Sequence, residues 1–308
     1  MFEDAFGHET RYLSARRNGQ VAGVLPLVLF RSRVFGRFIV SLPFVNYGGV
    51  VADDAATAAA LVDASAAIAR EEQCAHVELR HERRQFSDLP CKQHKVSMML
   101  TLETDAERAW SAMDRKVRNQ IRKAEKSGLT VETGGIDRLD DFYAIFARNM
   151  RDLGTPVYGR VFFERVLRTF AEQTLVVIVR NVQGPIAAGL AFRHGDIVEV
   201  PWASSLNEFR PLCPNHLLYW FVMKWAMEHR VRVLDFGRST PNEGTFHFKS
   251  QWGAEPSPLH WEYVLLGRHD LPDQSPKNPK FKLAIEAWKR SPLWLTNTIG
   301  PRIVRSIP

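Results

Sequence analysis

The stretch Val231–Gly253 carries the side chains best suited to chemistry in this chain of 308 residues. It starts as an apolar strand that leads to Asp235, breaks at Gly237, and then supplies Arg238 and, further on, Lys249. An acid at the end of an apolar strand, with cations delivered by the next loop, is a common way for α/β proteins to build a site. A strand end locked by a structural salt bridge explains the same residues equally well. The elements that position this stretch help to decide between the two interpretations.

Two parts of the chain show the same order of elements, namely hairpin, strand, helix and strand. Asn18-Gly19 between apolar runs predicts a two-residue hairpin turn, because both turn positions need positive φ, and Gly184-Pro185 marks a second turn. The repeat predicts an α/β protein with tandem domains of one fold, in which helices flank mixed sheets. The expected segments are 10–30, 38–51, 55–70 and 76–80 in the first copy, and 174–192, 197–202, 214–229 and 231–236 in the second.

Helical segments precede the second copy and have no counterpart ahead of the first. They are 105–127, 137–152 and 159–172. We therefore expect a first domain that lacks its N-terminal helices, either because the chain starts late or because this copy is reduced. The predicted organisation is an N-terminal domain at 1–100, a C-terminal domain at 101–267 and a basic, Pro-rich tail at 268–308.

The segment 105–127 predicts one amphipathic helix with a cationic face. Thr104 opens a capping box at its start, and the apolar positions share one side at about 100° per residue. Lys116, Arg118 and Arg122 lie on or beside the opposite side. A solvated helix face is the plain interpretation of such a charge run, whereas contact with a phosphate-rich ligand is the functional one.

The segment 214–229 is apolar nearly all round, which predicts a helix buried against a sheet. Pro214 removes one donor from its start. The N–H groups of Asn215, His216 and Leu217 remain as candidates for an anion. The sequence before this helix holds no Gly-rich phosphate loop, which weakens the prediction of an acidic-ligand pocket.

Composition excludes several classes of protein. No run approaches the roughly 20 apolar residues of a membrane span, and the N-terminus has no apolar signal-peptide core. Cys74, Cys91 and Cys213 show neither metal-ligand nor disulfide spacing, so we expect no metal site and a reducing cytoplasm. The net charge of +7 and the pI of about 9.4 favour a polyanionic partner.

The last 41 residues hold eight Lys and Arg against three acids. One short amphipathic helix with Phe281, Ile285 and Trp288 is expected there. A tail packed on the body of the protein is the first interpretation. The second is a basic, Trp-bearing segment that makes a peripheral contact with the inner face of the membrane.

Several motifs together resemble a known family. WSAMDRKVRNQIRKAEKSGLTVE, LGTPVYGRVFF and DFGRSTPNEGTFHFKSQWGAEPSPL are similar to the FemA/FemB/FemX group of tandem GNAT-like acyltransferases, as are AAGLAF, VPWASS, PNHLLYW and the tail SPKNPKF. The chain looks most like the FemAB-like proteins that accompany exosortase/PEP-CTERM exopolysaccharide systems. Proteins of this group usually begin earlier, which agrees with a shortened first domain.

The resemblance implies two tandem GNAT-like domains and transfer of an acyl or aminoacyl group to an amine in cell-envelope or exopolysaccharide biosynthesis. FemA/FemB/FemX proteins take an amino acid from aminoacyl-tRNA and add it to a peptidoglycan precursor, whereas related GNAT enzymes use acyl-CoA. Here NEFRPLCPNH replaces the R-x-x-G-x-G/A pyrophosphate loop, and no insertion matches the helical-hairpin arm of FemA. The donor is therefore left open among acyl-CoA, another acyl thioester and aminoacyl-tRNA, and no tightly bound cofactor is expected.

Within that activity Asp235 is the candidate for amine capture or general base, with a structural pair to Arg238 as the alternative. Arg238 and Lys249 are candidates for a phosphate of the donor or acceptor, or for the developing oxyanion. The further predicted substrate contacts are Lys116, Arg118, Arg122, Tyr158, Trp202, His216, Ser239 and Trp252. The competing function is a non-catalytic GNAT-like module that binds a sugar-phosphate or a nucleotide.

Overall fold

The computed structural model describes residues 1–32, 35–267, 270–272 and 282–307. The chain divides into two compact units, each made of segments that are distant in sequence. Unit 1 holds residues 1–95, 258–283 and 301–308, and unit 2 holds residues 96–257 and 284–300. Both units combine mixed sheets with helices, which confirms the predicted fold class.

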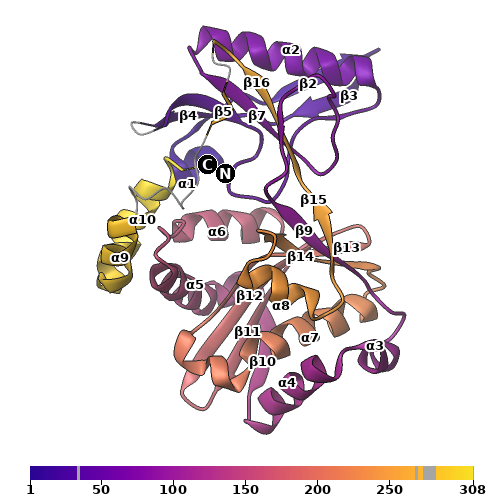
Figure 1. Cartoon of the computed structure of the whole chain (residues 1–308), viewed down its shortest axis with the longest axis vertical. Helices are drawn as coiled ribbons and strands as arrows, with labels where there is room; N and C mark the ends of the chain where they lie inside the picture. Colours follow the sequence, from indigo (N-terminus) through magenta and orange to yellow (C-terminus); the bar gives the residue numbers. More distant parts are fainter. Residues whose placement is uncertain (33–34, 268–269, 273–281, 308) are drawn as a thin grey trace. The chain divides into compact units, whose positions relative to one another are not determined.

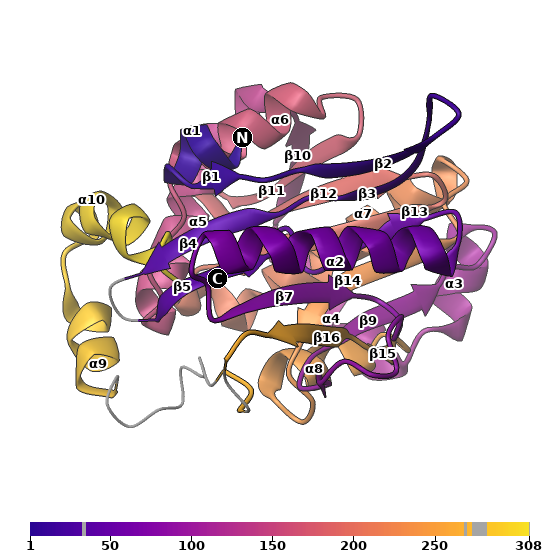
Figure 2. The same ribbon diagram turned by 90° about the horizontal axis from the view of Figure 1, so that it is seen from above.

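Unit 1 contains a six-stranded sheet in the order β1-β4-β5-β7-β16-β8 and a three-stranded sheet in the order β2-β3-β6. The long helix α2 packs against β2, β3, β6 and β7 (Figure 2). The elements are α1 Phe2–Phe6, β1 Glu9–Thr10, β2 Leu13–Arg17, β3 Gln20–Leu25, β4 Val28–Ser32, β5 Gly36–Val40, β6 Val51–Ala52, α2 Ala55–Glu71, β7 His76–His81, β8 Cys91–Lys92 and β16 His260–Leu265.

Local sequence explains much of unit 1. Asn18 and Gly19 have φ of 51° and 81° and join β2 to β3, so the predicted hairpin is confirmed. Asp54 starts α2, because its side chain accepts a hydrogen bond from the N–H of Thr57. The apolar side of α2 then covers Val77 and Leu79 of β7 in one core.

Unit 2 is built on a seven-stranded sheet in the order β10-β11-β12-β13-β14-β9-β15 (Figure 1). Its elements are β9 Val96–Thr101, α3 Ala106–Ala112, α4 Arg115–Lys126, β10 Thr130–Gly134, η1 Ile136–Arg138, α5 Leu139–Leu153, α6 Arg160–Thr169, β11 Thr174–Asn181, β12 Gly184–His194, β13 Ile197–Ser205, η2 Asn207–Leu212, α7 Pro214–Glu228, β14 Val233–Ser239, α8 Gly244–Ser250 and β15 Glu255–Pro258.

The core of unit 2 lies between its sheet and its helices. The predicted buried helix is α7, which packs on β11, β12 and β13 and shares a core with α3 and α4. Gly189 of β12 makes this approach close, because a Cβ there would lie 3.1 Å from the side chain of Leu218. Helix α5 packs on β11, β12 and β13 as well. Val176 and Val177, whose side chains point to opposite sides of β11, are both fully buried, so helices cover this sheet on both faces.

Unit 1 takes one strand from beyond the main segment of unit 2. Strand β16 comes after β14 and β15 in the chain but pairs with β7, whereas β9, the first strand of unit 2, pairs with β14 near the end of that segment. In Figure 1 β16 is an orange strand among purple ones in unit 1, and β9 is a purple strand among orange ones in unit 2. The compact units therefore differ from the predicted ranges 1–100 and 101–267, since residues 258–265 pack in unit 1.

The prediction of one continuous helix over 105–127 is wrong. It is two helices, α3 and α4, because Met113 is extended with ψ of 144° and Asp114 caps a new helix by accepting from the N–H of Lys116 at 2.6 Å. The cap of α3 is Asp105 and not Thr104. The turn predicted at Gly184-Pro185 lies instead at 182–183. Gly184 and Pro185 are the first two residues of β12.

The tail forms two helices where one was expected. They are α9 Lys282–Arg290 and α10 Leu293–Val304. A Cβ on Gly154 at the end of α5 would meet Ile285 of α9, and the guanidinium of Arg151 donates to the carbonyl of Ser291 at 3.1 Å. The whole motif SPKNPKF, which ends at Phe281, lies outside the described residues. None of the described helices combines the length and apolar character that a membrane crossing needs.

Candidate active site

The parallel strands β13 and β14 part directly after two acids. Their pairing runs from Ile197↔Val233 to Glu199↔Asp235. Beyond this point β13 continues beside β12, and β14 continues beside β9. Glu199 is half-buried and Asp235 is fully buried, and paired residues of a ladder lie on the same face of a sheet. Two carboxylates therefore mark the place where the two strands separate.

A β-bulge in β14 shapes this place. Asp235 pairs with Met99 and Arg238 pairs with Ser97, so β14 advances three residues while β9 advances two. The extra residue brings Asp235 and Arg238 to the same face of the sheet, whereas a regular strand would separate them. Gly237 inside the bulge has φ of 78°, a conformation that favours glycine. The predicted strand break at Gly237 is thus a bulge, and the strand continues to Ser239.

The carboxylate of Asp235 is held by two donors on one oxygen. The hydroxyl of Ser97 donates to Oδ1 at 2.5 Å, and the N–H of Gly237 donates to the same atom at 2.8 Å. The bulge supplies the second donor, because it turns the N–H of Gly237 toward the side chain of Asp235. Sequence and local backbone together therefore fix the position of this buried acid.

The ammonium of Lys249 reaches the same bulge from α8. Its Nζ donates to the carbonyl oxygens of Gly237 at 2.8 Å and Arg238 at 3.1 Å. An ammonium has three donors, so one N–H remains for another acceptor. Burial lowers the pKa of Lys249 to about 8; Asp235 opposes this shift, Arg238 adds to it, and Glu199 opposes it. The structure therefore brings Asp235, Arg238 and Lys249 together, as the spacing in the sequence predicted.

An aromatic wall joins the first turns of α7 to the segment after α8. The ring of His216 stacks on Trp252 with centroids 5.9 Å apart, and it meets the edge of Phe248 at 5.1 Å. Tyr219 packs on Phe236 at 4.8 Å. Burial and the nearby Asp235 raise the pKa of the Tyr219 phenol. Burial, followed by the charge of Lys116, lowers the pKa of His216 to about 4, so this ring is neutral near pH 7.

Three buried polar atoms near this wall and the end of β14 have no hydrogen-bond partner among the described residues. They are His216 Nε2, Trp252 Nε1 and Ser239 Oγ. Buried polar groups in proteins are nearly always paired. All three side chains were predicted substrate contacts from the sequence, and their unpaired atoms are consistent with a polar ligand.

The first turn of α7 offers fewer donors than the sequence suggested. The N–H groups of His216 and Leu217 both donate to the carbonyl of Cys213, at 3.1 and 3.4 Å. Cys213 adopts a left-handed conformation with φ of 60°, and Pro214 has no N–H. Asn215 is the one remaining donor of the predicted three. The main chain at this turn therefore does not form a phosphate cradle.

Helix α4 carries its cations near the same turn. Lys116 lies close enough to influence the pKa of His216, and Lys123 does the same for Cys213. Arg122 lies over the ring of Trp110 at 5.2 Å, and Arg118 is half-buried. Within the described part of the chain, no cation of α4 forms an ion pair. These side chains are Arg115, Lys116, Arg118, Arg122, Lys123 and Lys126.

Tyr158 and Trp202 belong to a different aromatic cluster. Trp202 meets the edges of Phe162 and Phe163 at 5.7 and 5.3 Å, and the hydroxyl of Tyr143 donates to the carbonyl of Tyr158 at 3.0 Å. The cluster joins α5, α6 and the part of β13 beyond the strand separation. These contacts favour packing, and a substrate role for Tyr158 and Trp202 remains a prediction.

The comparisons with known proteins agree with this geometry. Residues 111–250 match the family model of the acetyltransferase (GNAT) domain. The "Lipid II:glycine glycyltransferase" of Staphylococcus aureus (strain USA300) is 34% identical over 73 residues, which cover 21% of this chain and 17% of that protein. The crystal structure of FemX aligns with a TM-score of 0.64 at 16% identity, covering 90% of each chain. Residues 111–250 therefore form a GNAT domain, and the chain has the fold of FemX.

A second solved structure supports the tandem arrangement. A tandem GNAT protein from the clavulanic acid biosynthesis pathway aligns with a TM-score of 0.51 at 12% identity, covering 85% of each chain. At sequence identities this low, the likeness to FemX and to the clavulanic acid pathway protein shows the fold alone. The match to the curated relative spans less than a fifth of that relative's length.

The first unit also has a pair of parallel strands, but there the chain stays along the second strand where the first one ends. Strands β5 and β7 are parallel at Ile39↔Val77 and Val40↔Glu78. The chain after β5 stays hydrogen-bonded to β7. The N–H of Ser41 donates to the carbonyl of Glu78 at 2.9 Å, and the N–H of Gly48 donates to the carbonyl of Arg80 at 2.8 Å. Glu78 is the last residue of β7 paired with β5, as Asp235 is the last residue of β14 paired with β13, and its carboxylate accepts from Arg80 Nε at 2.7 Å.

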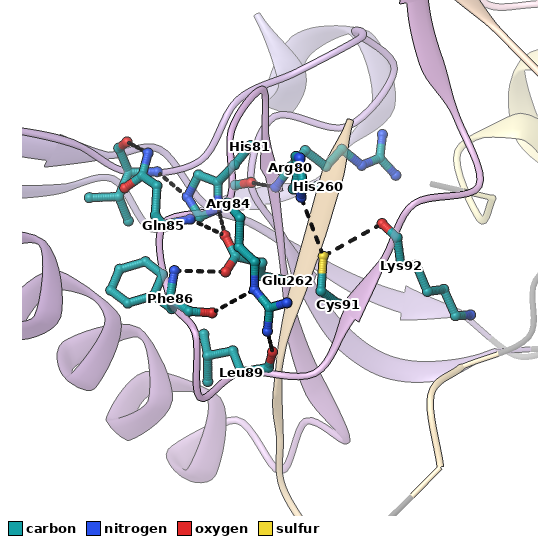
Figure 3. Close-up of polar contacts among 12 residues, drawn as sticks. Arg80, His81, Arg84, Gln85, Phe86, Leu89, Cys91, Lys92, His260 and Glu262 are labelled. Atoms are coloured by element: carbon teal, nitrogen blue, oxygen red, sulfur yellow. Dashed lines mark hydrogen bonds and ion pairs between the residues drawn. The ribbon is translucent and has the colours of Figure 1, made fainter. Parts of the chain in front are cut away.

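A second buried acid in unit 1, Glu262, also has its carboxylate engaged in hydrogen bonds within that unit (Figure 3). Glu262 accepts hydrogen bonds from the N–H groups of Gln85 at 3.0 Å and Phe86 at 2.8 Å, and it lies 2.7 Å from His81 Nδ1. The N–H of Val50 donates to His81 Nε2 at 3.0 Å, which makes Nδ1 the protonated nitrogen. Since both ring nitrogens are engaged, this cluster stabilises the fold of unit 1 and offers no free base.

Sequence reasoning missed two residues of this candidate site. Glu199 interrupts the apolar strand VEVPW, and this charge inside a strand was the available signal. Ser97 lies in a short strand far from Asp235 in the sequence, and no local pattern shows that the two meet. Both residues are placed by pairing between distant strands.

Proposed function

We propose that this protein transfers an aminoacyl or acyl group to an amine during cell-envelope assembly. The single observation that carries the proposal is the meeting of Asp235 and Lys249 at one bulge, where β13 and β14 part inside the GNAT domain. A base and a cation on either side of one backbone feature suit acyl transfer, which produces a proton and an oxyanion.

The proposed step uses both side chains. The nitrogen of the acceptor amine forms a bond to the acyl carbon, and the carbonyl oxygen becomes negative in the tetrahedral intermediate. The remaining N–H of Lys249 stabilises that oxygen. The carbon–oxygen bond of an ester donor, or the carbon–sulfur bond of a thioester, then breaks. The proton from the amine passes to Asp235 and from there to the leaving group.

An aminoacyl ester is the donor that the site favours over acyl-CoA. The first turn of α7 uses the N–H groups of His216 and Leu217 internally, and Pro214 supplies none. A pyrophosphate at that turn would find one main-chain donor, that of Asn215. The cations of α4 offer charge to a polyanion such as tRNA along a helix face instead. We therefore place aminoacyl-tRNA ahead of acyl-CoA and other thioesters.

For the acceptor we propose a phosphate-bearing precursor of the cell envelope. The relative from Staphylococcus aureus is named for glycyl transfer to lipid II. Arg238 lies on the same face of β14 as Asp235 and is the candidate for an acceptor phosphate. An exopolysaccharide precursor with an amine is the second acceptor that the proposal admits.

A transfer assay tests the proposal. The purified chain is incubated with a lipid II-type acceptor and with aminoacyl-tRNA or acyl-CoA, each labelled in the acyl group, and the acceptor is analysed by mass spectrometry. We expect label on the acceptor amine with aminoacyl-tRNA. Binding of acceptor without transfer from any donor would favour the non-catalytic module instead. That alternative is disfavoured by the contrast between units, because the acid Glu78 of unit 1 is bonded and the unit 2 site keeps an N–H of Lys249 for a ligand.

We also propose that the tail contacts the inner face of the membrane. Trp294 on α10 is 70% exposed, and Arg290 at the end of α9 is exposed as well. An exposed indole beside cations suits the interface of a bilayer with anionic lipids. Sedimentation with vesicles of anionic lipid tests this: we expect binding that Trp294→Ser weakens, and equal binding by the variant would contradict it. Thr298→Ser on the same exposed helix is the control.

A further inference from the structure

Strand β9 delivers a hydroxyl to the buried acid of the site. Ser97 is 3% exposed, and its Oγ donates to Asp235 Oδ1 at 2.5 Å. The N–H of Gly237 reaches the same oxygen at 2.8 Å. A short bond from a hydroxyl to a carboxylate is characteristic of a charge-assisted hydrogen bond. The orientation of this carboxylate therefore depends on one side chain as well as on the backbone of the bulge.

Ser97 lies outside the segment that matches the GNAT family model, which begins at residue 111. It reaches the site because β9 pairs antiparallel with β14 and places Ser97 opposite Arg238. Across a regular ladder, Ser97 and Asp235 would be too far apart for a hydrogen bond. The bulge at Gly237 shortens this diagonal and turns the two side chains toward each other.

We propose that Ser97 is a positioning residue for the transfer reaction, because its hydroxyl holds the Asp235 carboxylate in the orientation that receives the proton of the acceptor amine. This inference rests on the proposed function. It adds a strand from before the GNAT segment to the working parts of the site.

The consequence for Asp235 follows from the bonding. Without the Ser97 hydroxyl, Oδ1 keeps the N–H of Gly237 but loses the side-chain donor that helps to orient the carboxylate. The other charged or titratable groups around Asp235 stay in place when Ser97 is changed. They are Glu199 on β13, Tyr219 on α7, Arg238 on β14 and Lys249 on α8.

Two variants and a control isolate the hydroxyl. Ser97→Ala removes it, and Ser97→Thr keeps it on a residue that suits a strand. Ser65→Ala is the matched control, since Ser65 is fully buried in α2 and its hydroxyl donates to the carbonyl of Val62 at 2.6 Å. Melting temperatures of all three show whether the proteins remain folded.

The first measurement does not need activity. The carboxyl of Asp235 is followed by carbon-13 NMR in protein labelled at aspartate, with Asp235→Asn used to assign the signal. At one fixed pH we expect the chemical shift of this carboxyl to change in Ser97→Ala, because its oxygen loses a donor, and to stay in place in Ser97→Thr and Ser65→Ala. An unchanged chemical shift in folded Ser97→Ala would overturn the inference.

The second measurement is of kcat and KM at the same pH. We expect Ser97→Ala to lower kcat about tenfold with KM nearly unchanged, because a misaligned base weakens the transition state and not substrate binding, and Ser97→Thr to restore kcat. If the chemical shift changes and kcat does not, the positioning role in the reaction is refuted although the hydrogen bond is real. If the unaltered protein transfers nothing from any donor, the proposed function fails, and the NMR result still tests the bond between Ser97 and Asp235.

Discussion

The Nζ of Lys249 lies 2.8 Å from the carbonyl oxygen of Gly237, so the ammonium of α8 is bound to the same bulge that orients Asp235. One irregularity in β14 thus fixes an acid through its N–H and a cation through its C=O. Bulges near active sites commonly re-aim side chains in this way. A change to either partner should therefore alter the chemistry before it alters the fold.

Lys249 should control the alkaline side of the pH–rate profile. Burial lowers its pKa to about 8, so the stabilising ammonium is lost as the pH rises through that value. We expect Lys249→Met to lower kcat by about 100-fold, which is the effect of losing one oxyanion donor. Lys249→Arg keeps the charge to higher pH and should remove the alkaline limb. Lys289→Met, at a lysine of α9 that pairs with Glu286, is the control; a limb near pH 8 that persists in Lys249→Arg would assign it to another group.

Asp235 should supply the base of the reaction. Asp235→Asn can still accept from Ser97 and Gly237 but cannot take a proton, and we expect kcat to fall by about 100-fold or more. Its melting temperature should stay close to that of the unaltered protein. Asp196→Asn, at an acid paired with Arg232, is the control, and an unaltered kcat in folded Asp235→Asn would leave Asp235 a structural acid.

The sequence predicted the elements of this fold well where the signals are local. Asn18-Gly19 fixes its hairpin because both positions need positive φ, and the helix starting at Pro214 follows from its apolar residues. The grouping of Asp235, Arg238 and Lys249 was also predictable, since they lie within 15 residues of each other in one strand–loop–helix segment.

The features that the sequence did not reveal depend on distant pairing or on small backbone changes. Nothing in residues 96–101 shows that β9 pairs with β14, and nothing in 260–265 shows that β16 pairs with β7. Ser97 meets Asp235 because β9 pairs with β14, and Glu199 lies opposite Asp235 because β13 pairs with β14. Likewise, a glycine in a strand predicts either a break or a bulge, and only the partner strand decides which.

The cations of α4 should act on a polyanionic substrate. Lys116 is exposed and lies near His216, so Lys116→Glu should weaken binding of tRNA without unfolding the helix. If Lys116 contacts one phosphate, the slope of log affinity against log salt should decrease by about one. The measurement is tRNA binding over a series of salt concentrations. Arg70→Glu changes an exposed helix cation of unit 1 by the same charge and should leave the slope unchanged; equal effects of the two variants would indicate net charge alone.

The buried acid Glu262 should support stability and not catalysis. Burial raises its pKa, but the hydrogen bonds from His81, Gln85 and Phe86 outweigh burial, and the pKa is lowered overall. Its contribution is therefore present above the unfolded pKa and is lost as the pH falls through the folded one. We expect Glu262→Gln to lower the free energy of unfolding at pH 7 by about 2 kcal/mol, because an amide replaces a charged acceptor of buried hydrogen bonds. In urea unfolding, the difference from the unaltered protein should shrink toward low pH.

The same variant separates the roles of the two units. At temperatures well below melting, Glu262→Gln should transfer at nearly the original rate, because the acid of unit 1 has its bonds within that unit. Glu255→Gln, at an exposed acid of β15, is the control for both stability and rate. Loss of transfer by a Glu262→Gln protein with an unchanged melting temperature would contradict the assignment and place chemistry in unit 1. The contrast with Asp235→Asn, which should lose rate and keep stability, is the decisive comparison.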